Sequence, residues 1–401
     1  MIRDSPYIRI DMANNKVSIY LTLRRFRRRI KSQNKRNKRK KQRSFTLENN
    51  RKYREIAKLI HSYEDALLYF MPRNLSYLTQ NEKSPFYVKN LEKEKFKKVR
   101  TFDVPSCFSI IKNEKESFLF LKQIISAFVY QTCDDLWIDY RNCQETDLVT
   151  QIFLDAILLE IDCFIENCKK ANIYDKYVRL ASIGGKNMNN SSVRRLLNSV
   201  GSPAVLLNRQ ILYRDIIPYR LKRFDGKNLS HSSLLAQKEI DTTTLLDYVN
   251  SCLSRVKKSL NREAMKDLGY VVGETLINAE EHSSLRYRYL IGYFEECTED
   301  NRHFGMLNLV ILNFGQTIYE KFKYPDEGIP VNSDCLKKMK DLSDNFQSHS
   351  WFNRNSFTEE TLWTLYSLQE GVSCIPKDVC KRGNGTIQFI NSFFKLKGDD
   401  K

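Results

Sequence analysis

Polar and apolar side chains alternate with a helical period over residues 272–282. Three polar side chains are spaced four residues apart there, namely Glu274, Asn278 and His282. At 100° per residue they fall within one narrow stripe. The apolar side chains on the opposite side are Val272, Leu276 and Ala279. The pattern predicts an amphipathic helix with one face toward a core and one polar face.

An apolar run bounded by glycines follows at residues 305–314. Such a run favours a buried strand. It ends at Asn313, and Gly315 then lets the backbone turn closely past a flat ligand. Thr317 lies two residues further along the chain. We therefore expect a strand whose end presents an amide side chain beside a turn.

A pair of glycines marks a third segment, near the end of the sequence. Its residues are Lys381, Arg382, Gly383, Asn384, Gly385 and Thr386. Apolar residues at helical spacing follow, beginning with Ile387. Glycines just before a helix leave backbone N–H groups free beside the positive end of the helix dipole. This segment is therefore a candidate phosphate-binding turn.

Each segment also has an ordinary interpretation. A polar stripe is common on surface helices, and a single Gly-x-Gly is often a plain turn. Residues 272–282 also have a chemical interpretation. A carboxylate and a carboxamide one turn apart can bind a nucleotide together with its Mg²⁺ ion. The amide oxygen is a hard ligand for Mg²⁺, and the carboxylate can orient or deprotonate a nucleophile.

The order of the three segments resembles the GHKL (Bergerat-fold) ATPases over roughly residues 240–396. That superfamily unites gyrase, the histidine kinases, the mismatch-repair ATPases and the anti-sigma-factor kinases. The Asn-Ala-x-x-His ending at residues 278–282 is similar to the kinase and anti-sigma branch. The resemblance implies a C-terminal Bergerat-type α/β sandwich that binds ATP and Mg²⁺.

The resemblance also implies a role for each matching residue. Glu274 would be the general base, and Asn278 would coordinate the Mg²⁺ that bridges the phosphates. His282 would stabilise the nucleotide pocket. Asn313 stands where the family usually has an Asp that accepts the adenine amino hydrogen. The other nucleotide-binding positions would be Gly315, Thr317, Arg382, Gly383, Asn384, Gly385 and Thr386, with Arg382 or Lys381 adding positive charge near the γ-phosphate.

Two features depart from the family pattern. The segment between Gln316 and Lys381, where the family keeps its ATP lid, is long and contains two helical patterns, near Ser333–Leu342 and Glu359–Gln369. The sequence also stops soon after Phe394, whereas the family continues with further strands. We expect that the sheet is either completed elsewhere or reduced.

The middle of the sequence alternates between strand and helix patterns. These are a strand at Asp135–Tyr140, a helix at Leu148–Cys168, a strand at Tyr177–Ile183 and a helix at Ser191–Val200. Such alternation predicts a parallel or mixed sheet. It resembles a STAS-type domain, the partner fold of the anti-sigma kinases. The phosphorylatable serine of that family is missing here, which leaves Thr146 or Thr150 as substitutes or, as we favour, a docking domain.

Composition limits the class of protein. The chain has 401 residues and 41% hydrophobic content, enough for two or three domains with cores. No apolar run reaches the length of about 20 residues that a membrane helix needs, and no signal-peptide core is visible. The ten cysteines contain no Cys-x-x-Cys pair, which favours reduced, buried thiols. These observations predict a cytoplasmic protein.

Most of the net charge of +18 is concentrated in one stretch. Residues 24–43 contain thirteen Lys or Arg and no acidic residue. Such a block favours contact with phosphate backbones or other polyanions, and its alternative is a solvated linker. Since no recognition helix accompanies it, nucleic-acid contact would tolerate any sequence.

Together these patterns predict an α/β (α+β) protein in three parts. They are a basic, mostly helical region at 1–130, a STAS-like β/α domain at 131–235 and a GHKL-like domain with a lid insert at 236–401. The favoured function is Mg-ATP binding with slow hydrolysis or Ser/Thr phosphotransfer in a regulatory switch. The alternative is a non-enzymatic scaffold with a degenerate nucleotide pocket and a polyanion-binding arm. Many GHKL proteins work as dimers, so a homodimer and a protein partner are candidate assemblies.

Overall fold

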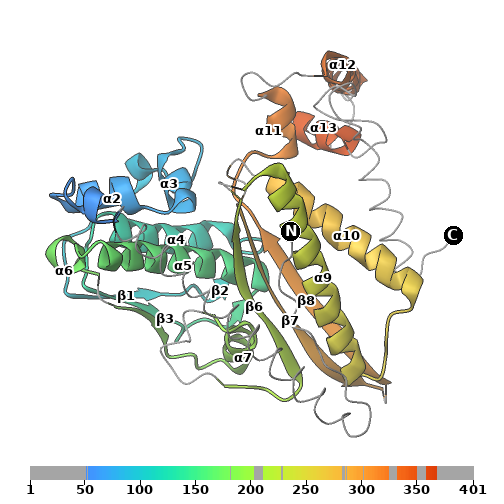
Figure 1. Cartoon of the computed structure of the whole chain (residues 1–401), viewed down its shortest axis with the longest axis horizontal. Helices are drawn as coiled ribbons and strands as arrows, with labels where there is room; N and C mark the ends of the chain where they lie inside the picture. The colour runs from blue at the N-terminus through green and yellow to red at the C-terminus, as the bar shows by residue number, and fades with distance from the viewer. Residues whose placement is uncertain are drawn as a thin grey trace, which may run out of the picture. The chain divides into compact units, whose positions relative to one another are not determined.

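The structure is a computed structural model in which the chain divides into two compact units. Unit 1 comprises Met1–Phe70 and Ile165–Val178, and unit 2 comprises Met71–Phe164 and Arg179–Lys401. The residues that the structure describes are 51, 53–180, 182–202, 211–226, 229–281, 285, 287–300, 302–324, 332–349 and 358–367. Figure 1 shows the helices and strands of these residues along the chain.

Unit 1 is helical in its described part. It contains α2 (Tyr63–Phe70), the end of α5 (Leu148–Lys170) and α6 (Tyr174–Tyr177). Ser62 begins α2, because its Oγ accepts a hydrogen bond from the Asp65 backbone N–H at 3.1 Å. The Tyr53 hydroxyl donates to Asn167 at 3.0 Å, and its ring lies 5.7 Å from that of Phe70.

A parallel sheet forms the first part of unit 2. Its strands are β1 (Val99–Asp103), β3 (Asp135–Asp139) and β5 (Ser182–Lys186), in the order β1-β3-β5. A second parallel pair consists of β2 (Cys107–Phe108) and β4 (Glu145–Thr146). The helical elements of this part are α3 (Arg73–Gln80), the single turn at Val88–Asn90, α4 (Glu114–Val129), α5 and α7 (Ser191–Val200). Helices between parallel strands provide the crossovers that such strands require.

The two long helices α4 and α5 provide most of the core beside this sheet. The rings of Phe128 in α4 and Phe164 in α5 meet edge-on at 5.2 Å. Leu136 and Ile138 of the central strand are fully buried. Each such side chain contributes roughly 1.5–3 kcal/mol to folding. The alternation along β3 thus decides which face of the strand joins this core.

An antiparallel sheet forms the second part of unit 2. Its strands are β6 (Ile216–Asp225), β7 (Tyr287–Glu299) and β8 (Arg302–Leu312), with β7 in the centre. Two helices, α9 (His231–Arg255) and α10 (Arg262–Glu281), lie side by side over one face, as Figure 1 shows. On that face, Leu245 of α9 and Leu276 of α10 pack against Leu290 of β7.

The opposite face of β7 packs against α5 and α7. Ile152 and Ala156 of α5, with Val200 of α7, form a buried cluster with Tyr289 and Ile291. Because successive residues of a strand point to opposite faces, β7 is buried on both sides over residues 287–292. It joins the two sheets of unit 2 into one packed structure.

The remaining helices have a small core of their own. They are α11 (Ile318–Lys323), α12 (Ser333–His349) and α13 (Glu359–Ser367). Phe322, Met339, Leu362 and Trp363 form a buried cluster among them. The indole N–H of Trp363 donates to Ser343 Oγ at 2.6 Å. The predicted helices near Ser333–Leu342 and Glu359–Gln369 are therefore present, although their bounds differ.

Most of the elements predicted for the middle of the chain are confirmed. The helix at Ser191–Val200 is α7, and Gly201 ends it with a left-handed φ of 66°. The predicted strand at Tyr177–Ile183 is present as β5, but its bounds are wrong, because α6 runs to Tyr177 and β5 begins only at Ser182.

Two further predictions need correction. The apolar run at 305–314 is part of β8, but this strand lies at the edge of the described sheet and is half-exposed rather than buried. Sheet pairing also crosses both expected domain boundaries. β1 pairs with β3 across residue 131, and β6 pairs with β7 across residue 236. Backbone hydrogen bonds between distant segments, rather than chain order, define these sheets.

The protein is thus a mixed α/β protein with parallel and antiparallel sheets. Among the described residues, no helix has both the length and the apolar character to cross a membrane. The eight cysteines in this part of the chain are free thiols, and four of them are buried. Burial raises the pKa of Cys133 and Cys143 to about 11. These two thiols are protonated at neutral pH.

Candidate functional site

Helix α10 carries the predicted polar stripe, and its orientation is set by its packing. Asn261 caps the helix, since its side-chain oxygen accepts from the Ala264 N–H at 2.7 Å. The apolar face predicted from the sequence is buried, with Val272 at 9%, Leu276 at 0% and Ala279 at 8% exposure. Glu274 therefore lies on a side of α10 that points away from the sheet.

Two glycines bring α10 close to α9. A Cβ on Gly269 would lie 3.2 Å from Leu246, and one on Gly273 would lie 3.5 Å from Lys238. Between the helices, the Thr242 hydroxyl is buried and has no hydrogen-bond partner among the described residues. This orphaned polar atom lies beside Gly273, one residue before Glu274.

Glu274 is half-buried on the helix surface. Burial raises the pKa of the Tyr270 hydroxyl, and the negative charge of Glu274 raises it further. Glu274 thus lies near Tyr270, one turn earlier on α10. Asn278 lies in the last part of α10, where the structure describes the backbone but not this side chain.

Asn313 follows directly after β8, on the side of the sheet that α10 covers. Leu309 and Ile311 pack against the α9–α10 cluster. Val310, Leu312 and Phe314 pack on the other side, where the Phe314 ring lies 5.4 Å from that of Phe153. Alternation therefore directs Asn313 toward the side of α9 and α10.

The strand register brings α10 and Asn313 to the same end of the sheet. Leu312 pairs with Tyr289, near the beginning of β7. Helix α10 ends at Glu281, and β7 begins six residues later at Tyr287. The end of α10 is therefore joined by a short connection to the start of β7, which pairs with the end of β8.

A charged pair that the sequence did not reveal lies at this end of the sheet. Arg288 of β7 is buried and pairs with Asp241 of α9, with 2.5 Å between Nη2 and Oδ2. Its guanidinium also lies 4.6 Å from the centroid of the Phe224 ring. Since the two charges are 47 residues apart in the chain, only the packing of α9 on the sheet shows that they meet.

Thr317, predicted to contact nucleotide, begins α11 with a reciprocal cap. Its Oγ1 accepts from the Glu320 N–H at 3.1 Å, and the Glu320 carboxylate accepts from the Thr317 N–H at 3.0 Å. Gly315 lies in a bend between β8 and α11, and its contact with a nucleotide stays a prediction.

Several predicted site residues lie outside the described residues. They are His282, Arg382, Gly383, Asn384, Gly385 and Thr386, together with Lys381. The expected meeting of the acidic helix with the diglycine turn therefore stays a prediction. Within the described part of the chain, no group of three or more His, Cys, Asp or Glu side chains is arranged to hold a metal ion.

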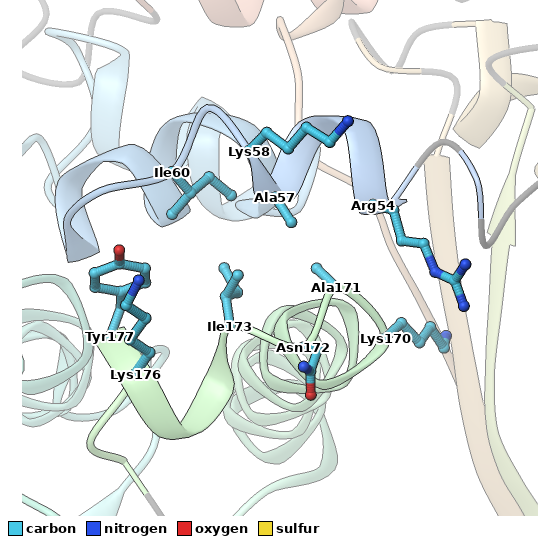
Figure 2. Close-up of a pocket in the computed structure, with 10 residues that line it drawn as sticks. All are labelled: Arg54, Ala57, Lys58, Ile60, Lys170, Ala171, Asn172, Ile173, Lys176 and Tyr177. Carbon is cyan, nitrogen blue, oxygen red and sulfur yellow. The ribbon is translucent and has the colours of Figure 1, made fainter.

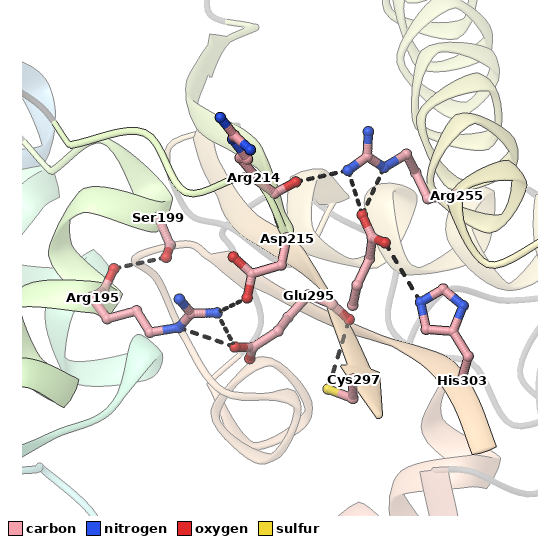
Figure 3. Close-up of polar contacts among 9 residues, drawn as sticks. Arg195, Ser199, Arg214, Asp215, Arg255, Glu295, Cys297 and His303 are labelled. Atoms are coloured by element: carbon pink, nitrogen blue, oxygen red, sulfur yellow. Dashed lines mark hydrogen bonds and ion pairs between the residues drawn. The ribbon is translucent and has the colours of Figure 1, made fainter. Parts of the chain in front are cut away.

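A second polar cluster lies at the other end of β7, as Figure 3 shows. Glu295 accepts from Arg195 of α7 at 2.6 Å, and the next residue, Glu296, pairs with Arg255 of α9 at 2.5 Å. Arg195 also lies 2.5 Å from Asp215 and holds the pKa of that carboxyl below its usual value. Both arginines have carboxylate partners, so we interpret this cluster as one that attaches α7 and α9 to the sheet.

Unit 1 contains a pocket of about 560 Å³. Figure 2 shows Ala57 and Ile60 facing Ala171 and Ile173 across it. The remaining lining residues are polar or basic, namely Arg54, Lys58, Lys170, Asn172, Lys176 and Tyr177. Among the residues that the structure describes, no acidic residue lines this pocket.

The two threonines considered as phosphorylation sites lie near the start of α5. Thr150 is fully buried, and its hydroxyl accepts from the Ile110 N–H at 2.8 Å. Asp147 caps the helix by accepting from the Thr150 N–H at 2.6 Å. The Thr146 hydroxyl is buried as well. These positions favour the alternative of a docking domain over a phosphorylated one.

Comparison with known proteins adds no identity. No family model, no curated protein and no solved structure matches this chain.

Proposed function

We propose that the chain binds ATP with Mg²⁺ between α10 and the end of β8, as GHKL proteins do. The register of β7 and β8 is the observation that supports this best. It brings Asn313 and the end of α10 to one end of the sheet, on one face. The two predicted segments thus occur at the same end of the sheet, which supports the proposal.

The residue types at this end of the sheet suit the proposed ligand. The amides of Asn278 and Asn313 and the carboxylate of Glu274 supply oxygens, which both Mg²⁺ and the adenine amino group require. Asn278 would hold the metal ion, and Asn313 would accept from the base. The orphaned Thr242 hydroxyl is a further polar group beside α10.

Glu274 would act as the general base in this proposal. Glu274 would accept the proton of the attacking group, either water in slow hydrolysis or a Ser or Thr hydroxyl in phosphotransfer to a partner. The oxygen of that group would bond to the γ-phosphorus as the bond to the β–γ bridging oxygen breaks and ADP leaves. Phosphoryl transfer depends mainly on positioning and charge neutralisation, so Lys381 and Arg382 would contribute positive charge. Such an activity suits a cytoplasmic regulatory switch, with a homodimer as the proposed assembly.

Two substitutions separate binding from turnover. We expect Asn278→Ala to abolish Mg²⁺-dependent ATP binding, because the metal loses its amide ligand. We expect Glu274→Ala to keep binding and to lower turnover by about 10²–10⁴-fold, the usual contribution of a general base. Isothermal titration with ATP, ADP and GTP, with and without Mg²⁺, measures binding, and phosphate release measures turnover.

Glu263→Ala provides the matched control. Glu263 lies in the first turn of the same helix, so its removal changes the charge of α10 without touching the proposed site. If the wild-type protein shows no thermal shift with Mg-ATP and both site variants behave like it, the proposal is wrong.

The second candidate function is a non-enzymatic scaffold with a degenerate nucleotide pocket. The concentration of thirteen Lys or Arg in residues 24–43 favours it, since such an arm binds polyanions without a reaction. In this case, deletion of residues 24–43 lowers the affinity for nucleic acid, and the wild-type affinity falls steeply with salt.

A further inference from the structure

The pocket of unit 1 has cationic ends and apolar side chains in its middle. Ile60 on one side and Ala171 and Ile173 on the other are each less than 5% exposed. Figure 2 shows Arg54 and Lys170 at one end and Lys176 with Tyr177 at the other. A ligand in this pocket would therefore meet apolar surface in the middle and positive charge at its ends.

The positive charges of the pocket are not neutralised within the described residues. Arg54, Lys58 and Lys170 form no ion pair there, whereas their neighbours Arg51 and Lys169 pair with Glu55 and Glu166. Lys170 and Lys176 lie at the C-terminal ends of helices, where the helix dipole favours cations. The dipole therefore explains why these two lysines are there, but it does not explain why Arg54 lines the same pocket.

The size and the aromatic ring indicate the class of ligand. A volume of about 560 Å³ lies within the range of about 300–1,000 Å³ for small-molecule sites. One nucleotide fits this range. Its phosphate suits Arg54 and Lys170, because guanidinium and ammonium groups bind phosphate by charge-assisted hydrogen bonds. Its flat base suits the apolar side chains in the middle of the pocket, with the Tyr177 ring, over which the Lys176 ammonium lies at 5.0 Å, at one end.

The sequence favours a polymer over a free nucleotide. Residues 24–43, which lie outside the described residues, carry thirteen basic side chains. A block of this kind attracts a phosphate backbone over several nucleotides. Bases are free to enter a pocket only when they are unpaired.

We propose that the pocket of unit 1 binds one nucleotide of a single-stranded nucleic acid, with its phosphate on Arg54 and Lys170. The site is separate from the proposed ATP site and does not depend on it. Each phosphate contact contributes to affinity through release of counterions, so the contribution depends on salt.

The test compares two double variants of the full chain. Arg54→Ala with Lys170→Ala removes two charges from the pocket, and Arg51→Ala with Lys169→Ala removes two charges outside it. We measure binding of a fluorescein-labelled oligo(dT) of about twenty nucleotides by anisotropy at several salt concentrations. The pocket variant should bind about tenfold more weakly, with a salt slope shallower by about 0.7 because one phosphate is no longer neutralised, whereas the control should stay near the wild type.

Three outcomes would overturn the proposal. One is an equal loss in both double variants, which would mean that only net charge matters. Another is a blunt-ended duplex that competes as well as the single strand. The third is a pocket variant that loses sedimentation with phosphatidylserine vesicles while it keeps oligonucleotide binding, which would assign the pocket to lipid. Arg54→Gln, a single exposed substitution, repeats the measurement if the double variant folds poorly.

Discussion

Individual residues of β7 and β8 show how closely the sheet and its helices are packed. Gly305 of β8 lies under the ring of Phe294, so that an added Cβ would lie 2.0 Å from a ring carbon. Phe294 cannot move easily, because it is 2% exposed and packs against Cys252 and Val256 of the α9 segment. Glycine at position 305 is therefore required by the neighbouring ring rather than by its own backbone conformation.

We expect Gly305→Ala to lower the free energy of unfolding by about 1–3 kcal/mol, the usual cost of overpacking a core. The matched control is Gly273→Ala in α10, where the new Cβ would have ordinary contacts at 3.5 Å. That substitution should stabilise the protein by roughly 0.5–1 kcal/mol, since alanine is the better helix residue. Urea unfolding measures both. Equal urea midpoints for the two variants would contradict the close packing of Phe294 on Gly305.

At the scale of elements, β7 is the strand on which the helices of unit 2 are fixed. Glu295 and Glu296 are adjacent and point to opposite faces. Glu295 pairs with Arg195 of α7, as Figure 3 shows, and Glu296 pairs with Arg255 of α9. The Arg255 guanidinium also donates to the carbonyl of Arg214 at 2.7 Å. Because successive side chains of a strand point to opposite faces, two adjacent carboxylates pair with two different helices.

A double-mutant cycle tests this arrangement. We expect Arg195→Ala and Glu295→Ala to be coupled by about 1 kcal/mol, because the pair is partly buried and has two hydrogen bonds. The cycle of Arg195→Ala with Glu296→Ala is the control and should show coupling near zero, since Glu296 faces α9. Urea unfolding of the single and double variants supplies the values. Coupling that is equal in both cycles would contradict the assignment of faces.

At the scale of the whole molecule, one buried carboxyl links stability to pH. Asp155 of α5 is fully buried, and Gln151 and Ser202 donate to the same carboxylate oxygen at 2.8 and 2.6 Å. The other oxygen has no hydrogen-bond partner among the described residues. Burial raises the pKa of Asp155 to about 7, although the hydrogen bonds from Ser202 and Gln151 oppose the shift.

Asp155 should therefore make the protein less stable as the pH rises. An unfolded aspartate loses its proton near pH 4, whereas the folded one keeps it until about pH 7. The folded state thus binds the extra proton between these values, and the free energy of unfolding falls across that window. Between pH 5 and pH 8 the wild type should lose about 2–3 kcal/mol more than Asp155→Asn, which cannot titrate. Urea unfolding at both pH values measures the difference, and parallel pH profiles would contradict it.

Local patterns predicted the helices of the candidate site well. The apolar face of α10 follows from spacing alone, because a helix that covers a sheet must bury one stripe. The start and end of α7 follow from Asn190 and Gly201, whose side chain and left-handed backbone act within one turn. The sequence also indicated Asn313 as the end of a strand. These features depend on residues no more than a few positions apart.

Tertiary structure decided everything that depends on distant partners. The exposure of β8 depends on its place at the edge of a sheet, and the Arg288–Asp241 pair depends on how α9 lies over β7. The pocket of unit 1 unites residues 54–60 with residues 170–177. By itself, the sequence determined which faces are apolar and where helices begin and end, since short-range sterics and capping control these. Which segments meet was decided only by the fold, because burial and hydrogen bonding select among many pairings that the local pattern allows equally.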